Sequence, residues 1–352
     1  MRIDDLDTPC VVIDLDRVDR NLRRFQTYCD DNGLANRPHV KTHKIPEFAR
    51  RQVALGAGGI VCQKLGEAEV MADAGLDDIL IPYNLVGAHK LRRAVALARR
   101  VTLSLTCDSE ATAEGLSAAF DQAGLTVALS VECDTGAKRC GVQSPAEAAA
   151  LARRIDALPG LTFAGLMTYP SPGSQHEVQA FLTEAVAECA AAGLRADVVS
   201  NGGSPDMWTA HTVAAATEHR AGTYIYYDRS MVAFGAASLD DCALRVRATV
   251  VSRPTADRVI VDAGSKTISS DIINTEGHCT VLEYPAARLS KLSEEHGHLD
   301  FSGESVRPAI GEILTIVPNH ACAVSNLHDV VHGVVGDDVE RSYPVAARGR
   351  VV

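Results

Sequence analysis

Short apolar runs rich in β-branched residues alternate with amphipathic helical stretches along most of this chain. Eight such runs follow one another, and we expect a strand at each: Arg37–His43, Gly59–Gln63, Ile79–Pro82, Val101–Thr106, Val127–Val131, Phe163–Thr168, Val198–Ser200 and Gly222–Tyr226. Eight strands alternating with helices are typical of a (β/α)8 TIM-type barrel. An open doubly wound α/β sheet has the same alternation, but no GxGxxG turn supports its dinucleotide-binding form.

The pattern changes near Phe234, after which strands dominate. The expected strands there are Arg245–Ser252, Arg258–Val261, Cys279–Leu282 and Ile313–Val317. Turn residues separate them, which indicates a second, mostly β domain. We therefore expect a barrel domain over residues 8–233, beginning with a strand at Cys10–Ile13 and a helix from Leu15 to Cys29. Residues 234–352, together with residues 1–7, form the expected β domain.

Charge and length limit the class of protein. The chain has 352 residues, enough for a barrel and a smaller domain, and a formal net charge of −11. A negative surface argues against nucleic acid or an anionic membrane as a partner. The first residues form no signal region and no apolar run reaches the length of a membrane span, so we expect a cytoplasmic protein acting on a small molecule.

In a parallel barrel, reactive groups lie at the carboxyl ends of the strands. The first expected strand ends in the cationic run Arg37-Pro38-His39-Val40-Lys41-Thr42-His43-Lys44. A lysine that points from a strand into a partly desolvated pocket becomes nucleophilic, although a surface basic cluster would look the same. The seventh strand ends in Ser200-Asn201-Gly202-Gly203-Ser204, whose backbone N–H groups could approach an anion or form a plain turn.

His320 and Cys322 follow the last of these strands of the β domain. Two residues apart on an extended segment, their side chains would point to the same side. Imidazole and thiolate together suit Zn²⁺, but two ligands are few, and a buried histidine and cysteine remain the alternative. The other cysteines are scattered without CxxC pairs, which favours small buried hydrophobes over a disulfide framework.

The run RPHVKTHK, preceded by TPCVVIDLD and followed by VCQKLGEAE, resembles the D-threonine aldolase and D-serine dehydratase family. These are fold-type III pyridoxal 5′-phosphate (PLP) enzymes with an alanine racemase-like barrel. The resemblance continues in order through ECDTGAKRCGV, FAGLMTY, SNGGSP, TEHRAGTYIYYD, VDAGSKTISSD, SEEHG, VPNHAC and PVAARGR. It therefore covers nearly the whole chain.

The resemblance implies a role for each matching residue. Lys41 is expected to hold PLP as a Schiff base, and His39 or His43 to act as a base. Other expected contacts to the cofactor are Arg139, Tyr169, Ser200, Gly202, Gly203, Ser204 and Tyr224, of which Ser200, Gly202, Gly203 and Tyr224 match phosphate contacts. His320 and Cys322 are expected to bind a divalent metal, Zn²⁺ or Mn²⁺.

The resemblance implies a lyase acting on D-3-hydroxy amino acids, and it favours retro-aldol cleavage of the D-threonine aldolase type. Elimination to a 2-oxo acid and ammonia, as in D-serine dehydratase or a 3-hydroxyaspartate dehydratase, is the alternative. The CQKxxEAE element is more similar to the aldolase branch, whereas aldolases of this family tend to carry a carboxylate where Cys322 stands. A racemase and a non-catalytic PLP-binding protein are weaker alternatives. The family also implies a homodimer.

Overall fold

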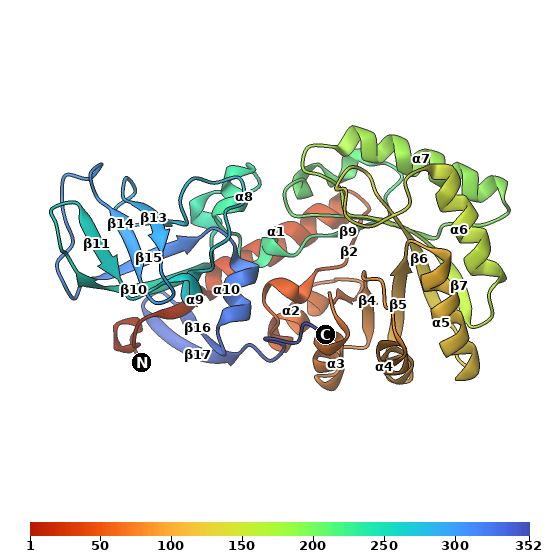
Figure 1. Ribbon diagram of the computed structural model, residues 1–352, viewed down its shortest axis with the longest axis horizontal. Coiled ribbons are helices and arrows are strands. Elements are labelled where there is room, and N and C mark those ends of the chain that lie inside the picture. The colour runs from red at the N-terminus through yellow and green to blue at the C-terminus, as the bar shows by residue number, and fades with distance from the viewer. The chain divides into compact units, whose positions relative to one another are not determined.

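The computed structural model describes residues 1–352, which divide into two compact units (Figure 1). The barrel unit comprises residues 25–41, 46–222 and 350–352. The β unit comprises residues 1–24, 42–45 and 223–349. The predicted fold class is confirmed, because one unit contains eight parallel strands and the other is mostly β.

The barrel unit is built on one sheet whose neighbouring strands are all parallel. In sheet order, the strands are β2 (Ala35–Asn36), β9 (Glu218–Arg220), β8 (Val198–Gly202), β7 (Leu161–Thr168), β6 (Val127–Cys133), β5 (Thr102–Cys107), β4 (Asp78–Ile81) and β3 (Ile60–Val61). The N–H of Val61 donates to the carbonyl of Pro38 over 2.8 Å, and His39 bridges to Val61. The chain beyond β2 therefore meets β3, and the sheet closes on itself.

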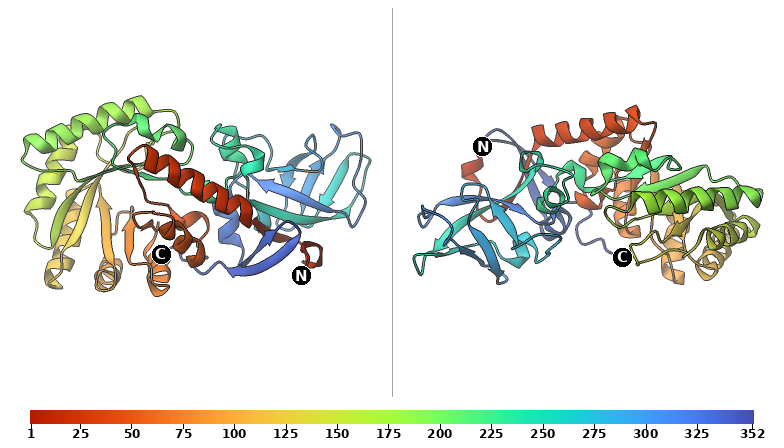
Figure 2. Two further views of the ribbon diagram at one scale, coloured as in Figure 1. Left: turned by 180° about the vertical axis from the view of Figure 1, so that it is seen from behind. Right: turned by 90° about the horizontal axis from the view of Figure 1, so that it is seen from above.

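Amphipathic helices lie around the outside of this sheet (Figure 2). They are α2 (Pro46–Ala54), α3 (Leu65–Asp73), α4 (Ala88–Ala98), α5 (Glu110–Gln122), α6 (Pro145–Ala157) and α7 (Gln175–Ala191). Two of them begin at a serine that caps the helix: Ser109 accepts from the N–H of Thr112, and Ser144 from that of Glu147. No helix of the chain combines the length and the apolar character that crossing a membrane requires.

Two of the predicted barrel strands differ from the structure. The extended chain after β2 continues pairing with β9 only as far as His39, and residues Val40–Thr42 form a 3-10 turn (η2). Pro38 has no N–H to offer to β3, so that edge carries only an isolated bridge. The predicted strand at Gly222–Tyr226 is wrong, because the last strand is β9 and Thr223–Ile225 is a 3-10 turn (η4).

The β unit contains a nine-stranded sheet. Its strands are β1 (Cys10–Asp14), β10 (Leu244–Ser252), β11 (Arg258–Val261), β12 (Cys279–Val281), β13 (Arg288–Leu292), β14 (Gly297–Asp300), β15 (Ile313–Pro318), β16 (Val330–Val335) and β17 (Asp338–Pro344). β1 lies between β10, its antiparallel partner, and β16, its parallel partner. Residues 8–24, predicted in the barrel domain, therefore belong to the β unit, because the apolar β1 is a buried central strand of that sheet.

Short helices complete the β unit: α8 (Arg229–Ala233), α9 (Ser265–Ile268) and α10 (Ala321–Leu327), with the 3-10 turns η1 (Ile3–Asp5) and η5 (Leu239–Asp241). The barrel unit has one further 3-10 segment, η3 (Met207–Thr212), where a short helical stretch is expected from the sequence.

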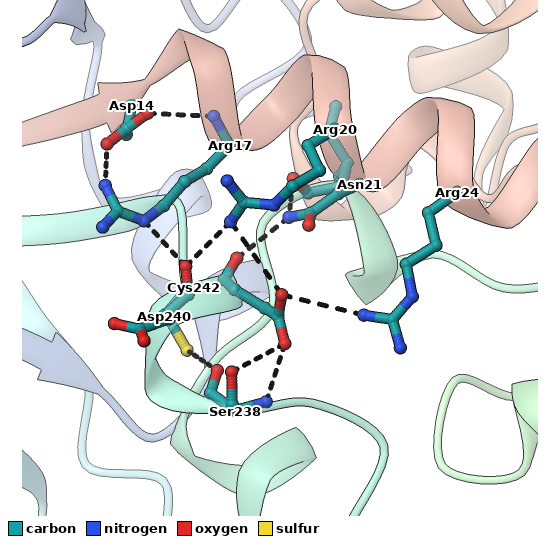
Figure 3. Close-up of polar contacts among 10 residues, drawn as sticks. Asp14, Arg17, Arg20, Asn21, Arg24, Ser238, Asp240 and Cys242 are labelled. Atoms are coloured by element: carbon teal, nitrogen blue, oxygen red, sulfur yellow. Dashed lines mark hydrogen bonds and ion pairs between the residues drawn. The ribbon is translucent and has the colours of Figure 1, made fainter.

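Helix α1 (Leu15–Asp31) begins in the β unit, where arginines attach its first turns to η5 (Figure 3). Arg20 donates to the carbonyl of Asp240 over 2.9 Å. The guanidinium groups of Arg20 and Arg24 lie 3.9 and 3.7 Å from the carboxylate of Asp241. This cluster pairs cations with a carboxylate and a carbonyl of the same unit, so we assign it a structural role.

Strand β7 lies close against β8 at Gly165, next to an irregularity in its pairing with β6. A Cβ atom at Gly165 would overlap the carbonyl oxygen of Val198, and the residue has φ +149°. We therefore expect Gly165→Ala to lower the free energy of unfolding of the barrel unit by at least about 2 kcal/mol. Trp208, the only tryptophan, lies in this unit, so urea unfolding followed by its fluorescence measures the effect.

Gly193→Ala is the matched control for this prediction. Gly193 also has a positive φ, +78°, but a Cβ atom there would meet nothing within 4 Å. Its replacement should cost only about 1 kcal/mol, from backbone conformation alone. Equal losses in the two variants would contradict the close approach of β7 to β8.

Candidate active site

Lys41 is half-buried and lies in the turn η2, directly after the chain that extends β2. The sequence predicted it on the strand, and the structure places it one turn beyond the strand end. It is the last residue of its segment of the barrel unit, and Thr42 begins the segment 42–45 of the β unit. The lysine nevertheless lies at the carboxyl end of the strands, where reactive groups of parallel barrels are found.

His39 is buried near Lys41, and its Nε2 lies 2.9 Å from Oε1 of Gln63. Burial and the positive charge of Lys41 hold the pKa of His39 well below its usual value. The imidazole is therefore neutral at pH 7. His43 differs, because its Nδ1 accepts from the N–H of Ile45 over 3.0 Å and its fully buried ring packs 6.4 Å from that of Tyr226.

Arg139, Tyr169 and Gly203 come together from the loops after β6, β7 and β8. The guanidinium carbon of Arg139 lies 4.7 Å from the centroid of the Tyr169 ring, a distance suited to a cation–π contact. A Cβ atom on Gly203 would lie 3.8 Å from Cε2 of Tyr169. Arg139 also approaches the buried carboxylate of Glu132 at 3.7 Å. The structure therefore gathers three of the predicted cofactor contacts at the barrel rim.

The glycine turn after β8 carries the backbone expected to hold a phosphate. Gly203 has φ +116°, and its N–H makes only a long 3.5 Å contact with the carbonyl of Arg220. The N–H of Gly202 already donates to Oδ1 of Asn201 over 2.8 Å. The hydroxyl of Ser204 accepts from the N–H of Gly222 over 3.1 Å, which ties the turn to the chain after β9. The N–H of Gly203 is thus the donor of this turn with most capacity left for an anion.

Ser200 and Tyr224 have different surroundings from the glycine turn. The buried Ser200 hydroxyl contacts the carboxylate of Glu218 and lies 2.5 Å from Nη1 of Arg220. Its side chain thus orients charged groups inside the barrel. Tyr224, only 1% exposed, belongs to the β unit. Their roles as phosphate contacts stay predictions.

Arg220 is a candidate cofactor contact that the sequence reasoning missed. Its guanidinium is buried in the barrel and donates to the Ser200 hydroxyl and, over 2.7 Å, to the carbonyl of Thr168. Burial lowers the pKa of Arg220 to about 10, although the carboxylates of Glu218 and Glu132 oppose this. The available signal was the spacing of Glu218 and Arg220, which places both side chains on one face of β9.

In the β unit, His320 and Cys322 do not lie on an extended segment, so that prediction is wrong. His320 precedes α10, and Cys322 lies in its first turn. Asp228 explains the early start of the helix, because its Oδ2 accepts from the N–H of Ala321 over 2.9 Å. The side chains of His320 and Cys322 still lie close enough to interact, because Cys322 raises the pKa of His320. Cys322 Sγ also lies 3.2 Å from Oγ1 of Thr42.

The surroundings of His320 suit a cation. Burial lowers the pKa of His320, but Cys322, Asp271 and Asp228 outweigh it and raise that pKa to about 10. Nδ1 of His320 lies 2.6 Å from Oδ2 of Asp271. No group of three or more His, Cys, Asp or Glu side chains is arranged to hold a metal ion. An imidazole and a thiol are nevertheless donors of the kind that bind divalent ions such as Zn²⁺.

Comparisons with known proteins agree with this two-unit architecture. The alanine racemase N-terminal domain model matches residues 13–230, and a serine dehydratase domain model matches residues 243–334. D-threonine aldolase of an Arthrobacter species is 35% identical over 98% of this chain and 93% of the relative. D-threo-3-hydroxyaspartate dehydratase of Delftia sp. is 36% identical over 90% of this chain and 91% of the relative.

A solved structure extends the likeness to three dimensions. The crystal structure of D-threonine aldolase from Filomicrobium marinum superposes with a TM-score of 0.92 at 33% identity, covering 99% of this chain and 97% of that one. The resemblance inferred from the sequence is thereby confirmed. The chain belongs to the alanine racemase N-terminal domain family and, within it, to the group that includes D-threonine aldolase and D-threo-3-hydroxyaspartate dehydratase.

Proposed function

We propose that this protein is a PLP- and divalent-metal-dependent lyase that cleaves D-3-hydroxy amino acids of the D-threonine type to glycine and an aldehyde. The observation that carries the proposal is the 35% identity with D-threonine aldolase, which extends over 98% of the chain and so includes both units. In this cleavage the Cα–Cβ bond breaks, the hydroxyl oxygen becomes the aldehyde oxygen, and Cα takes up a proton.

The barrel rim contains side chains suited to PLP. Lys41 would hold the cofactor through its amine, the N–H of Gly203 would donate to the phosphate, and Arg139 and Tyr169 would lie beside the ring. Arg220 reaches the same rim through its contact with the carbonyl of Thr168, the last residue of β7. Bound PLP supplies an electron sink for the electron pair left on Cα when a substrate bond breaks.

His320 and Cys322 would hold the metal ion. An imidazole and a thiolate suit Zn²⁺ better than Mn²⁺, which prefers oxygen ligands. A bound divalent ion supplies a positive charge that lowers the pKa of a hydroxyl. Within the β unit, Oγ1 of Thr42 lies 3.2 Å from Cys322 Sγ.

Of the two histidines near Lys41 in the sequence, we propose His39 as the group that accepts the hydroxyl proton. Its Nδ1 makes only a long 3.5 Å contact with the backbone N–H of Lys41, and its ring lies close enough to Lys41 for the charge of that lysine to lower its pKa. His43 is less suited, since its Nδ1 accepts from the backbone of Ile45 and its ring is fully buried. We assign His43 to packing.

A second candidate function is elimination of water to give a 2-oxo acid and ammonia. Two observations favour it: Cys322 supplies a thiolate where a carboxylate is expected in an aldolase, and the Delftia dehydratase is 36% identical to this chain. In that reaction Lys41 would remove the α-proton and the hydroxyl would leave as water. The two reactions differ in the bond that breaks at Cα.

We further propose that the enzyme acts in the cytoplasm as a homodimer on a small-molecule substrate, without a nucleic acid or membrane partner. The net charge of −11 supports the absence of polyanionic partners. Light scattering of the purified protein should give twice the chain mass of 37.4 kDa.

The proposal is tested by product analysis with PLP and Zn²⁺, offering D-threonine beside L-threonine. We expect glycine and acetaldehyde in equal amounts from D-threonine and at most traces from L-threonine. Formation of 2-oxobutyrate and ammonia without glycine would support the dehydratase instead. Turnover of neither compound by a protein that binds PLP would reject D-threonine as the substrate.

Replacement of Lys41 tests the cofactor assignment. Lys41→Ala should abolish the visible absorbance of lysine-bound PLP and lower turnover by at least about 10³-fold. Lys41→Arg should fail equally, because a guanidinium keeps the charge but does not lose a proton at neutral pH. The exposed Lys291 of β13 offers a control, and Lys291→Ala should behave as wild type. Retention of absorbance and turnover in Lys41→Ala would remove the assignment.

The metal pair is tested separately from PLP. His320→Ala and Cys322→Ala should each abolish turnover, and added Zn²⁺ should not restore it, while the visible absorbance of PLP remains. Removal of metal from the wild-type protein with a chelator should give the same loss, but Zn²⁺ should reverse it. Loss of PLP in step with activity would indicate that His320 and Cys322 have a structural role.

A further inference from the structure

We infer that Asp271 is a positioning residue that fixes the ring of His320 for metal binding. The inference rests on the metal site of the proposed function and adds a residue that does not itself bind the ion. Its basis is the 2.6 Å contact between Oδ2 of Asp271 and Nδ1 of His320. Asp271 is 49 residues from His320 in sequence, on the segment between α9 and β12.

This segment is attached to the residue next to His320. The side-chain amide of Asn319, which is 1% exposed, donates to the carbonyls of Asp271 and Gly277 over 3.0 and 2.8 Å. Nη1 of Arg229 donates to Oδ1 of Asn319 over 3.0 Å and to the carbonyl of Glu276 over 2.5 Å. Asn319 and Arg229 thus hold the backbone of Asp271 at a fixed distance from His320, so their meeting does not depend on an unsupported loop.

The contact determines which nitrogen of His320 can bind a metal. A carboxylate at Nδ1 keeps a proton on that nitrogen, and the lone pair of the neutral ring then lies on Nε2. The carboxylate also limits rotation of the ring and raises the basicity of Nε2 toward a cation. Asp271 faces Nδ1, so it lies on the side of the ring opposite to the nitrogen that would bind the ion.

A plain surface ion pair is the alternative explanation of the contact. The Asp271 side chain is 46% exposed and that of His320 29%, so their attraction should contribute little to folding. The two explanations therefore predict different affinities of the protein for the metal, which can be measured without substrate and without turnover. A surface ion pair would leave the affinity unchanged, whereas a positioning carboxylate would not.

The experiment measures the Zn²⁺ dissociation constant of the PLP-loaded protein by competition with a chromophoric chelator. For Asp271→Ala we expect binding about 10- to 100-fold weaker than wild type, the usual range for loss of such a carboxylate. Asp271→Asn retains an oxygen that can accept from Nδ1–H, so its loss should be smaller. In Co²⁺-loaded samples, the thiolate-to-metal absorption band should remain in both variants, because Cys322 is unchanged.

Glu276→Gln is the matched control, because it removes a carboxylate from the same segment without removing a contact to His320. Its Zn²⁺ affinity should equal that of wild type. The inference is overturned if Asp271→Ala binds Zn²⁺ within twofold of wild type, if Glu276→Gln weakens binding equally, or if the wild-type protein binds no Zn²⁺. A wild type that binds Zn²⁺ but yields no glycine from D-threonine contradicts the proposed function alone.

Discussion

A buried guanidinium organises the interior of the barrel unit. Arg220 is removed from water, and an uncompensated charge there would cost several kcal/mol. Glu218 and Glu132 supply the opposite charge, and Glu218 in turn pairs with Arg37 over 2.6 Å. Arg37 also pairs with Asp78 over 2.6 Å. The Asp78 side chain is partly exposed, so the network reaches solvent there. The polar core of this barrel is therefore a chain of matched charges.

Two glycines leave room for this chain of charges. A Cβ atom at Gly202 would lie 2.8 Å from Nη2 of Arg220, and one at Gly59 would clash with the guanidinium of Arg37. The glycine at position 202 thus has a structural cause, because a side chain there would meet Arg220.

The β unit uses a buried amide in the same way. Asn319 is nearly inaccessible, and its hydrogen bonds to two carbonyls and to Arg229 hold the segment of Asp271 beside His320. The sequence pattern could not predict the contact between Asp271 and His320, because the two residues meet through tertiary structure alone.

The strands β13 and β17 were not predicted from the sequence for another reason: their residues are largely exposed and form no apolar run. By contrast, β5, β6 and β11 lie close to their predicted bounds because their apolar residues are buried.

Cleavage of the D-threonine aldolase type breaks the Cα–Cβ bond of a D-3-hydroxy amino acid and leaves its Cα–H bond intact. D-threonine that carries deuterium at Cα tests it most directly, with the products analysed by mass spectrometry. We expect glycine that retains one deuterium, released together with unlabelled acetaldehyde. Release of the deuterium to water with formation of 2-oxobutyrate would contradict it, because that result requires cleavage of the Cα–H bond.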